Sequence, residues 1–241
     1  QVGRTGKLTP VALLRPVDVS GVTVSRATLH NAGEVAKKDI RVGDTVRIER
    51  AGDVIPAVVE RIPQKDERRK RPFAMPAACP VCASPVVEEG ANHFCTGGLS
   101  CPAQLTRGIE HFASKGALDI DGLGKKTVAA MVDRGLVSSV AGIYRLDEKA
   151  LLNLEGFADK SAANLLAAIA KSKKVALDRF LYALGIRNVG EHVAALLAAH
   201  YGTIDAVLEA TEDDLMTIHE VGPEVARSVS SYFADGKTKA L

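Results

Sequence analysis

The stretch Ile120-Asp-Gly-Leu-Gly-Lys-Lys-Thr-Val128 decides how the second half of this chain folds. It sets an apolar residue, two further positions, a second apolar residue and a small residue in front of a helical segment. The same order returns three times, with first residues 34, 32 and 32 positions apart. The later copies are Leu154-Glu-Gly-Phe-Ala-Asp-Lys-Ser-Ala162, Ile186-Arg-Asn-Val-Gly-Glu-His-Val-Ala194 and Ile218-His-Glu-Val-Gly-Pro-Glu-Val-Ala226. Such a period predicts an all-α array of hairpins between helices.

The first hairpin has the residues that suit contact with an anion. The turn needs unusual backbone dihedrals, which its two glycines, Gly122 and Gly124, supply cheaply, and the missing side chains let an external group approach the main chain. The helix that begins at Gly124 points free N–H groups outward, which makes an anion site. Lys125 and Lys126 meet the helix dipole unfavourably unless a phosphate is present. We therefore predict phosphate binding; the alternative is that the hairpins are only compact connectors.

The four hairpins are not equally suited to a phosphate. Ala158 replaces the second glycine of the second hairpin. In the fourth, Glu220 replaces the first glycine and Pro223 removes one N–H group. Asn188 in the third is a milder change, because Asn tolerates left-handed conformations. We expect the first hairpin to bind most strongly and the third next. The candidate phosphate-binding residues here are Gly122, Gly124, Lys125, Lys126, Arg187, Gly190 and Gly222.

All four cysteines lie in one short window, as Cys79-x2-Cys82 followed by Cys95 and Cys101. This spacing is typical of a closed tetrahedral zinc site, which is structural because no coordination position stays open. Metal binding would also supply folding free energy that so short a segment lacks. Two disulfides, or reduced cysteines that bind nothing, are the alternatives. His93 lies close enough to compete as a ligand, and we expect it to be a bystander.

In the first 63 residues, β-branched residues alternate with polar ones between Gly and Pro breaks. We expect strands at Val22–Arg26, Thr45–Glu49 and Val54–Ile62, and a short helix at Asn31–Lys38 with Asn31 as its N-cap. Several short strands with one small helix indicate a small closed or half-closed barrel. The charge run Lys65–Arg71 beside prolines then indicates a solvated linker.

Length and composition bound the class of protein only loosely. A chain of 241 residues, 46% of them hydrophobic, is ordinary for a globular protein. Its net charge of +2 is too small to diagnose a polyanionic partner. No stretch approaches the roughly 18 to 20 apolar residues that span a bilayer. The chain opens with Gln1 instead of Met, and we expect its natural beginning to be missing.

In this order, the β-rich segment, the cysteine window and the repeats resemble the C-terminal part of NAD-dependent bacterial DNA ligases. The matching stretches are Gln1-Val-Gly-Arg-Thr-Gly6, Leu8-Thr-Pro-Val-Ala12, Ala27-Thr-Leu-His-Asn31, Arg50-Ala-Gly-Asp-Val-Ile-Pro56, Cys95-Thr-Gly-Gly98 and Arg179-Phe-Leu-Tyr-Ala-Leu-Gly-Ile-Arg187. The resemblance covers essentially the whole chain. It implies a multidomain fold: an OB-fold barrel at 1–66, a linker and four-cysteine zinc finger at 67–102, and an all-α helix-hairpin-helix DNA-binding domain with four repeats at 103–241.

The resemblance also implies a parent enzyme that seals nicks in duplex DNA during replication and repair. In that family, NAD adenylates a lysine in a Lys-x-Asp-Gly motif, the adenylate passes to the 5′-phosphate, and the 3′-hydroxyl displaces AMP. No Lys-x-Asp-Gly occurs in this sequence. We therefore expect a chain that binds DNA without forming an adenylate, placed between the adenylation domain and a terminal BRCT domain.

The implied cofactors are zinc in this chain and NAD in domains of the parent enzyme that are absent here. The implied partners are nicked double-stranded DNA and the adenylation domain of the same chain, in a monomeric, nucleoid-associated protein of the bacterial cytoplasm without membrane contact. The OB domain would lie across the nick in the minor groove, and the hairpins would hold phosphates on both strands. The finger would set the angle between barrel and helices. The candidate contacts in the barrel are Arg4, Arg26, Arg47 and Arg50, each of which is otherwise a solvated surface arginine.

Two other functions compete with this interpretation. A stand-alone DNA-binding or interaction protein with no enzymatic parent would need its own start methionine, and the opening at Gln1 argues against it. An AMP- or NAD-binding catalytic domain fails for want of a nucleotide-binding lysine motif.

Overall fold

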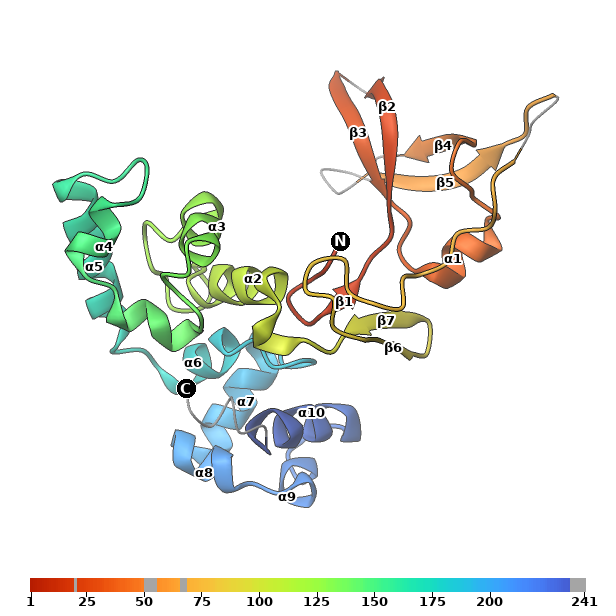
Figure 1. Ribbon diagram of the computed structural model, residues 1–241. Helices are drawn as coiled ribbons and strands as arrows, with labels where there is room; N and C mark the ends of the chain where they lie inside the picture. The colour runs from red at the N-terminus through yellow and green to blue at the C-terminus, as the bar shows by residue number, and fades with distance from the viewer. Residues whose placement is uncertain (20, 50–55, 66–68, 235–241) are drawn as a thin grey trace. The chain divides into compact units, whose positions relative to one another are not determined.

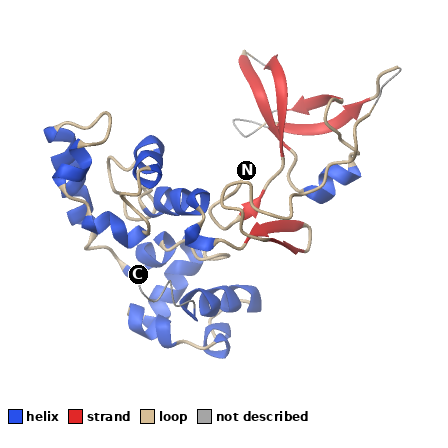
Figure 2. Ribbon diagram, viewed as in Figure 1, coloured by secondary structure: helices blue, strands red, loops and turns tan. Residues whose placement is uncertain are grey.

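A computed structural model describes residues 1–19, 21–49, 56–65 and 69–234 of the chain. The chain divides into two compact units, residues 1–104 and 105–241. Within the described ranges, every strand lies in the first unit and the second unit is helical (Figures 1 and 2). No helix in those ranges is long and apolar enough to cross a membrane.

The first unit contains a four-stranded sheet with the order β2-β3-β5-β4. Two antiparallel pairs, β2 with β3 and β4 with β5, meet where β3 and β5 run parallel at Thr28 and Ala57. Its elements are β2 (Val11–Val19), β3 (Val22–Thr28), α1 (Ala32–Lys37), β4 (Thr45–Glu49) and β5 (Ala57–Ile62). The buried core beneath them consists of Ala27, Leu29, Val35, Ile40 and Val58. This is the OB-fold that the sequence predicts.

The alternating pattern located most of these elements. Strand β4 has the predicted bounds, and β3 runs two residues beyond Arg26. Helix α1 begins after Asn31, whose side chain accepts the N–H of Glu34 at 2.8 Å, as expected of an N-cap. Strand β5 begins at Ala57, and residues 54 and 55 of the predicted strand lie outside the described ranges.

Strand β2 was not among the strands predicted from the sequence, and it contains Pro16. A proline inside a run argues against a strand because it has no N–H for the ladder. Here the register of β2 against β3 is irregular between Leu13 and Val17, on either side of Pro16. Prolines occur in strands at such irregularities. The irregular register between Leu13 and Val17 therefore explains how β2 can contain Pro16.

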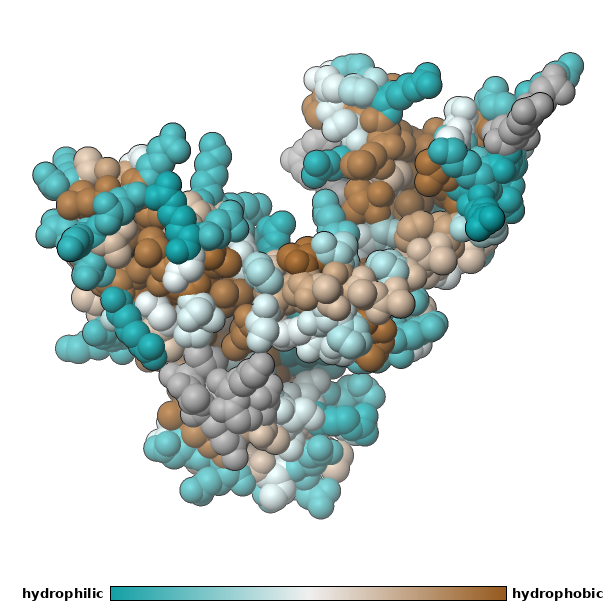
Figure 3. All heavy atoms as spheres, in the orientation of Figure 1, coloured by the Kyte–Doolittle hydropathy of each residue, from teal (hydrophilic) through white to brown (hydrophobic). Residues whose placement is uncertain are grey.

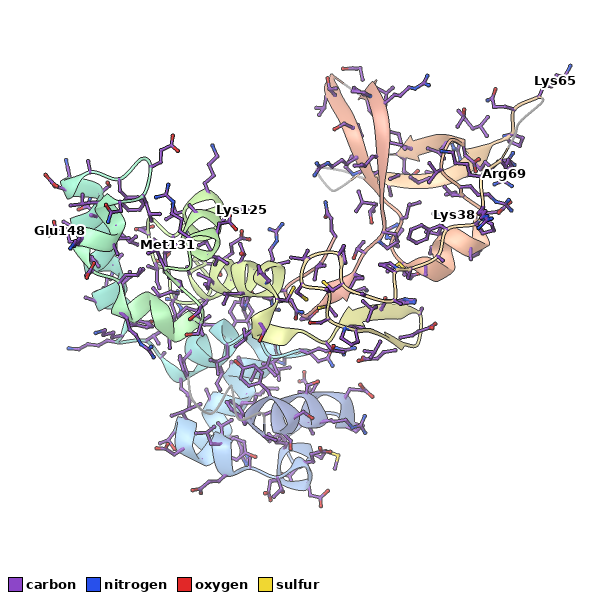
Figure 4. The ribbon with its side chains drawn as sticks, viewed as in Figure 1. Lys38, Lys65, Arg69, Lys125, Met131 and Glu148 are labelled. Atoms are coloured by element: carbon purple, nitrogen blue, oxygen red, sulfur yellow. The ribbon has the colours of Figure 1, made fainter. Side chains whose placement is uncertain are left out.

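The charged segment after β5 is held against the barrel. Arg69 forms ion pairs with Asp39 and with Asp44, the latter at 2.9 Å. The side chain of Asp44 is only 3% exposed. Figure 4 labels Arg69 in this segment and Lys38 at the end of α1. A solvated linker is thus the wrong description of Arg69, which holds this segment to the barrel by charge-assisted hydrogen bonds.

The cysteine window folds around a second sheet, with the order β1-β7-β6. Its strands are β1 (Lys7–Leu8), β6 (Val86–Glu89) and β7 (Asn92–Cys95), followed by the short 3-10 helix η1 (Gly98–Ser100). Strand β1 comes from the segment that the sequence assigns to the barrel, yet it pairs with β7 of the cysteine window. Arg4 precedes β1 and so lies outside the barrel sheet. The boundaries at 66 and 102 stay a prediction.

The second unit repeats a helix, a hairpin and a helix. The four repeats are α2 (Pro102–Phe112) with α3 (Lys125–Asp133), α4 (Glu148–Leu152) with α5 (Asp159–Ser172), α6 (Leu177–Ala183) with α7 (Glu191–Tyr201), and α9 (Glu212–Met216) with α10 (Pro223–Ala234). The connectors η2 (Val140–Arg145) and α8 (Ile204–Glu209) separate the members of each pair of repeats. Repeats one and two share one buried core, and repeats three and four share another.

Candidate metal centre and nucleic-acid interface

The four cysteines come together at one point. The Sγ atoms of Cys79, Cys82, Cys95 and Cys101 all lie within 4.8 Å of one another. All four are free thiols, and only Cys82 is partly exposed. Four Zn–S bonds of about 2.3 Å would place the sulfurs about 3.8 Å apart, so the cluster fits one tetrahedral ion. The disulfide alternative is not what the structure has.

His93 stands outside this cluster, as the sequence predicts. Its Nε2 atom lies 4.0 Å from a carboxylate oxygen of Glu88, its cross-strand neighbour. Among the described residues, the cluster that could hold a metal ion therefore consists of the four thiols.

The backbone and one hydroxyl support the sulfurs. Gly97 donates its N–H to Cys95 Sγ at 3.3 Å, and the thiol of Cys82 lies 3.3 Å from the Ser84 hydroxyl. That hydroxyl lowers the pKa of Cys82 to about 6, whereas burial raises the pKa of Cys95 to about 12. A Cβ atom on Gly97 would lie 3.0 Å from Cys82 Sγ, so glycine is required there. Such contacts orient metal ligands and tune them.

All four hairpins of the second unit have the same turn. The fourth residue of each turn donates its N–H to the carbonyl of the first, which is the leading apolar residue of the repeat, at 3.0 to 3.3 Å. The third turn residue has positive φ in every copy: Gly122 (91°), Gly156 (85°), Asn188 (63°) and Glu220 (70°). A type II turn requires positive φ at this position. Asn and Glu therefore occupy a glycine-type conformation in the later repeats.

The second glycine of the first hairpin, Gly124, is not needed for the backbone conformation of the turn. Gly124 has φ −75°, which any residue can adopt, so unusual dihedrals are needed only at Gly122. A Cβ atom on Gly124 would meet nothing within 4 Å, and the same holds for Gly190 and Gly222. The second repeat indeed has Ala158 there. Since the described fold does not require glycine at this position, its effect is to keep the main chain open to an approaching group.

Two of the helices that follow the hairpins, α3 and α7, begin without a side-chain cap, as does α6 at Ala176. Five elements start at a side chain that accepts a backbone N–H: Asn31, Ser139, Asp147, Thr203 and Thr211. Helices α3 and α7 start at Gly124 and Gly190 without such a side-chain bond. Their first N–H groups are therefore left for an acceptor outside the helix.

In the second and fourth hairpins, fewer backbone N–H groups are left for an acceptor outside the protein. In the second, the Ala158 N–H donates to Ser161 Oγ at 2.8 Å. In the fourth, the Val225 N–H donates to the Gly222 carbonyl at 3.0 Å, and Pro223 has no N–H. These hairpins offer fewer free backbone donors than the first, and the ranking of the four hairpins for phosphate stays a prediction.

The charged side chains near the hairpins also favour phosphate binding at the first and third hairpins over the fourth. Lys125 and Lys126 are exposed on the first turn of α3, and Figure 4 labels Lys125 there. Arg187 is exposed in the turn of the third hairpin. In the fourth, Glu220 lies 2.8 Å from His192, and this hydrogen bond lowers the pKa of Glu220. A carboxylate that stays ionised beside the fourth hairpin opposes phosphate binding.

The predicted barrel contacts are dispersed. Arg26 is exposed on β3 opposite Leu13, while Arg47 pairs with Glu60 across β4 and β5 at 3.1 Å. Arg50 lies outside the described residues. In Figure 3, hydrophobic residues gather over the β2–β3 part of the barrel. Sequence reasoning did not single out the exposed apolar residues of this ribbon, which are Leu13, Val17 and Val22.

Comparison with known families matches each part of the chain. Residues 1–70 match the NAD-dependent DNA ligase OB-fold domain, and residues 78–103 match the NAD-dependent DNA ligase C4 zinc finger domain. Residues 115–171 match a SAM-like helix-hairpin-helix tandem, and residues 179–241 match a helix-hairpin-helix motif. By these matches the chain corresponds to the OB, zinc-finger and helix-hairpin-helix region of the NAD-dependent DNA ligase family.

Curated relatives agree along the whole chain. A DNA ligase of Salinibacter ruber is 51% identical over 100% of this chain, and one of Syntrophus aciditrophicus is 52% identical over 100%. A DNA ligase of Marinobacter nauticus is 54% identical over 97% of it. The chain spans only 35 to 36% of the length of these relatives. The similarity therefore covers about a third of each of these ligases.

Proposed function

We propose that this chain is the part of an NAD-dependent DNA ligase that grips nicked duplex DNA. The observation that carries the proposal is the start of α3. Gly124 is open on its Cα face, the helix has no side-chain cap, and Lys125 and Lys126 are exposed on its first turn. Uncapped N–H groups beside cations suit a phosphate oxygen. The third hairpin, with Gly190 and Arg187, is the second anchor.

Zinc has a structural part in this proposal. Cys79, Cys82, Cys95 and Cys101 would hold it with no open position, so the ion supplies folding free energy and no chemistry at the nick. The residues that surround the sulfurs would help to keep the cysteine window folded.

The catalytic chemistry belongs to the parent enzyme in this proposal. NAD binding and lysine adenylation would occur in domains outside this chain, because the sequence contains no Lys-x-Asp-Gly. The barrel would lie at the nick, where Arg26 and Arg47 are the candidate contacts within the described residues. The whole enzyme would then seal nicks in replication and repair.

The test combines this chain with a separately made adenylation-domain fragment. We expect the chain alone to bind a nicked duplex, to form no adduct with AMP-labelled NAD and to seal no nick. Adding the adenylation fragment in trans should restore sealing above the level of that fragment alone. A labelled, acid-stable adduct on this chain would refute the assignment. Duplex binding without any stimulation of sealing would favour the second candidate, a stand-alone DNA-binding module.

A further inference from the structure

The first nine residues are built into the cysteine-containing module. Lys7 pairs with Phe94, and Leu8 pairs with His93, which makes β1 the third strand of the sheet. The segment also folds on itself, since Thr9 donates its N–H to the Gln1 carbonyl at 2.9 Å. The residues that match the zinc finger family begin only at position 78. The folded module is therefore larger than the finger that the family match delimits.

Cys95 is the point where this segment meets the metal site. Its N–H donates to the Gly6 carbonyl at 2.9 Å. Its carbonyl accepts from the Gln104 side-chain amide at 3.3 Å, and its Sγ accepts from the Gly97 N–H at 3.3 Å. Gln104 is only 6% exposed, so this amide acts from inside the module. Three separate parts of the chain thus fix one ligand.

Gly6 allows this approach for two independent reasons. Its φ is +80°, a left-handed conformation that side chains rarely adopt. A Cβ atom there would lie 2.7 Å from the Cys95 carbonyl oxygen and 3.0 Å from Gln104 Oε1. The first of these is a backbone atom of a ligand and cannot swing away. Any larger residue must push β1 away from the strand that holds Cys95.

The same segment forms part of the apolar wall around the sulfurs. Val2 and Leu8 are 9% and 4% exposed and belong to one buried cluster with Cys79, Cys95 and Cys101. The apolar shell around a metal site controls the access of solvent. Removing residues 1–9 would therefore open the ligand side of the site to water.

We propose that residues 1–9 are an integral strand of the zinc module, and that Gly6 and Gln104 are positioning residues for the ligand Cys95. Metal binding and the ordering of residues 1–9 are then coupled, although Gly6 lies far from the cysteine window in sequence. Loss of zinc releases the segment that leads into the barrel, and displacement of that segment speeds the loss of zinc. This inference rests on the zinc occupancy proposed above and is independent of DNA binding.

The experiment measures zinc release from the full chain to a chromophoric chelator. In Gly6→Ala we expect release to be about 10- to 100-fold faster than in the parent, the range typical of losing an outer-shell contact of a metal ligand. Gly90→Ala is the matched control, because Gly90 has φ +58° in the same module and open space around it. Gly3→Ala controls for the substitution itself, since its Cβ would meet only the Lys7 carbonyl at an ordinary 3.5 Å. The excess of Gly6→Ala over Gly90→Ala reports the contact with Cys95.

A second measurement needs no variant and decides the matter if Gly6→Ala does not fold. Amide hydrogen exchange of the parent is followed with zinc and after chelation. We expect the N–H groups of Gly3, Gly6 and Thr9 to lose protection on chelation, while those of the β4–β5 pair keep it. A parent without zinc defeats the zinc proposal itself. A parent that contains zinc, together with release from Gly6→Ala as slow as from Gly90→Ala or unchanged protection of residues 1–9, overturns the coupling.

Discussion

The carboxylate of Glu220 lies 2.8 Å from the imidazole of His192 and so joins the fourth hairpin to the helix of the third. A second bond runs the other way, because Asn188 in the third turn donates to Ser228 of α10 at 3.2 Å. Repeats three and four are thus tied crosswise above their shared core. In the alignment of the repeats, Glu220 of the fourth hairpin occupies the position of Gly122 in the first, so the fourth hairpin has a carboxylate there.

Replacing Glu220 by glycine should raise the thermal stability of the chain and its affinity for DNA. Glu220→Gly removes a side chain from a φ of +70° and a negative charge from the hairpin, and the ion pair that it loses is exposed and worth little. We expect a higher thermal midpoint and tighter binding to a nicked duplex. Glu220→Gln should tighten binding without the gain in stability. Glu209→Gln on α8 makes the same charge change away from the hairpins and serves as the control; equal affinity gains in both Gln variants would contradict this role.

The hairpin chemistry could be predicted from sequence because it is local. A turn, a helix start and two lysines occupy consecutive positions, and the internal repeat supplied four copies for comparison. The same reasoning could not find that Gly124 and Gly122 serve different purposes. That distinction depends on φ and on the open space around Gly124, which only the folded chain reveals.

The zinc site should be lost when a single ligand is replaced. Cys79→Ser leaves three thiols, and we expect the purified variant to contain far less zinc than the one ion per chain of the parent, with the cysteine window unfolded. Metal analysis and amide exchange of β6 and β7 measure the two effects. Thr96→Ser in the same window should retain the metal. Zinc-free parent protein, with Cys79→Ser as well folded as that parent, would disprove a structural zinc site.

The stability contributed by the ion pairs of Arg69 with Asp39 and Asp44 should depend on pH. Arg69 and its hydrogen bonds hold the pKa of Asp44 and of Asp39 below the usual range. A depressed carboxyl pKa contributes stability above the unfolded pKa of about 4, and this is lost as pH falls through the lower folded value. Arg69→Ala should therefore lower the thermal midpoint of the first unit at pH 7 more than Arg71→Ala does. The difference should shrink below about pH 4; a difference that persists at pH 2 would contradict the ion-pair origin.

The contacts that the sequence did not reveal all join distant segments. Strand β1 has two residues and pairs with β7, far along the chain, so no alternation marks it. In the sequence, Arg69 belongs to a run of charged residues typical of a solvated linker. Only the structure shows its ion pair with the buried Asp44. The cysteines were found readily, because four zinc ligands in one window have a characteristic spacing, whereas Gly6 and Gln104 have no such signature.

The measurement that tests the central claim most directly is a salt titration of nicked-duplex binding. Lys125→Ala with Lys126→Ala should weaken binding and flatten the slope of log affinity against log salt by up to about 2 units, similarly for all DNA sequences. Gly124→Val should weaken binding by blocking the backbone. Lys171→Ala with Lys174→Ala makes the same charge change at the far end of α5 from its hairpin and should leave the slope nearly unchanged. If folded variants of the fourth hairpin lose more affinity than those of the first, or if the two double variants behave alike, the account of phosphate binding at the start of α3 is contradicted.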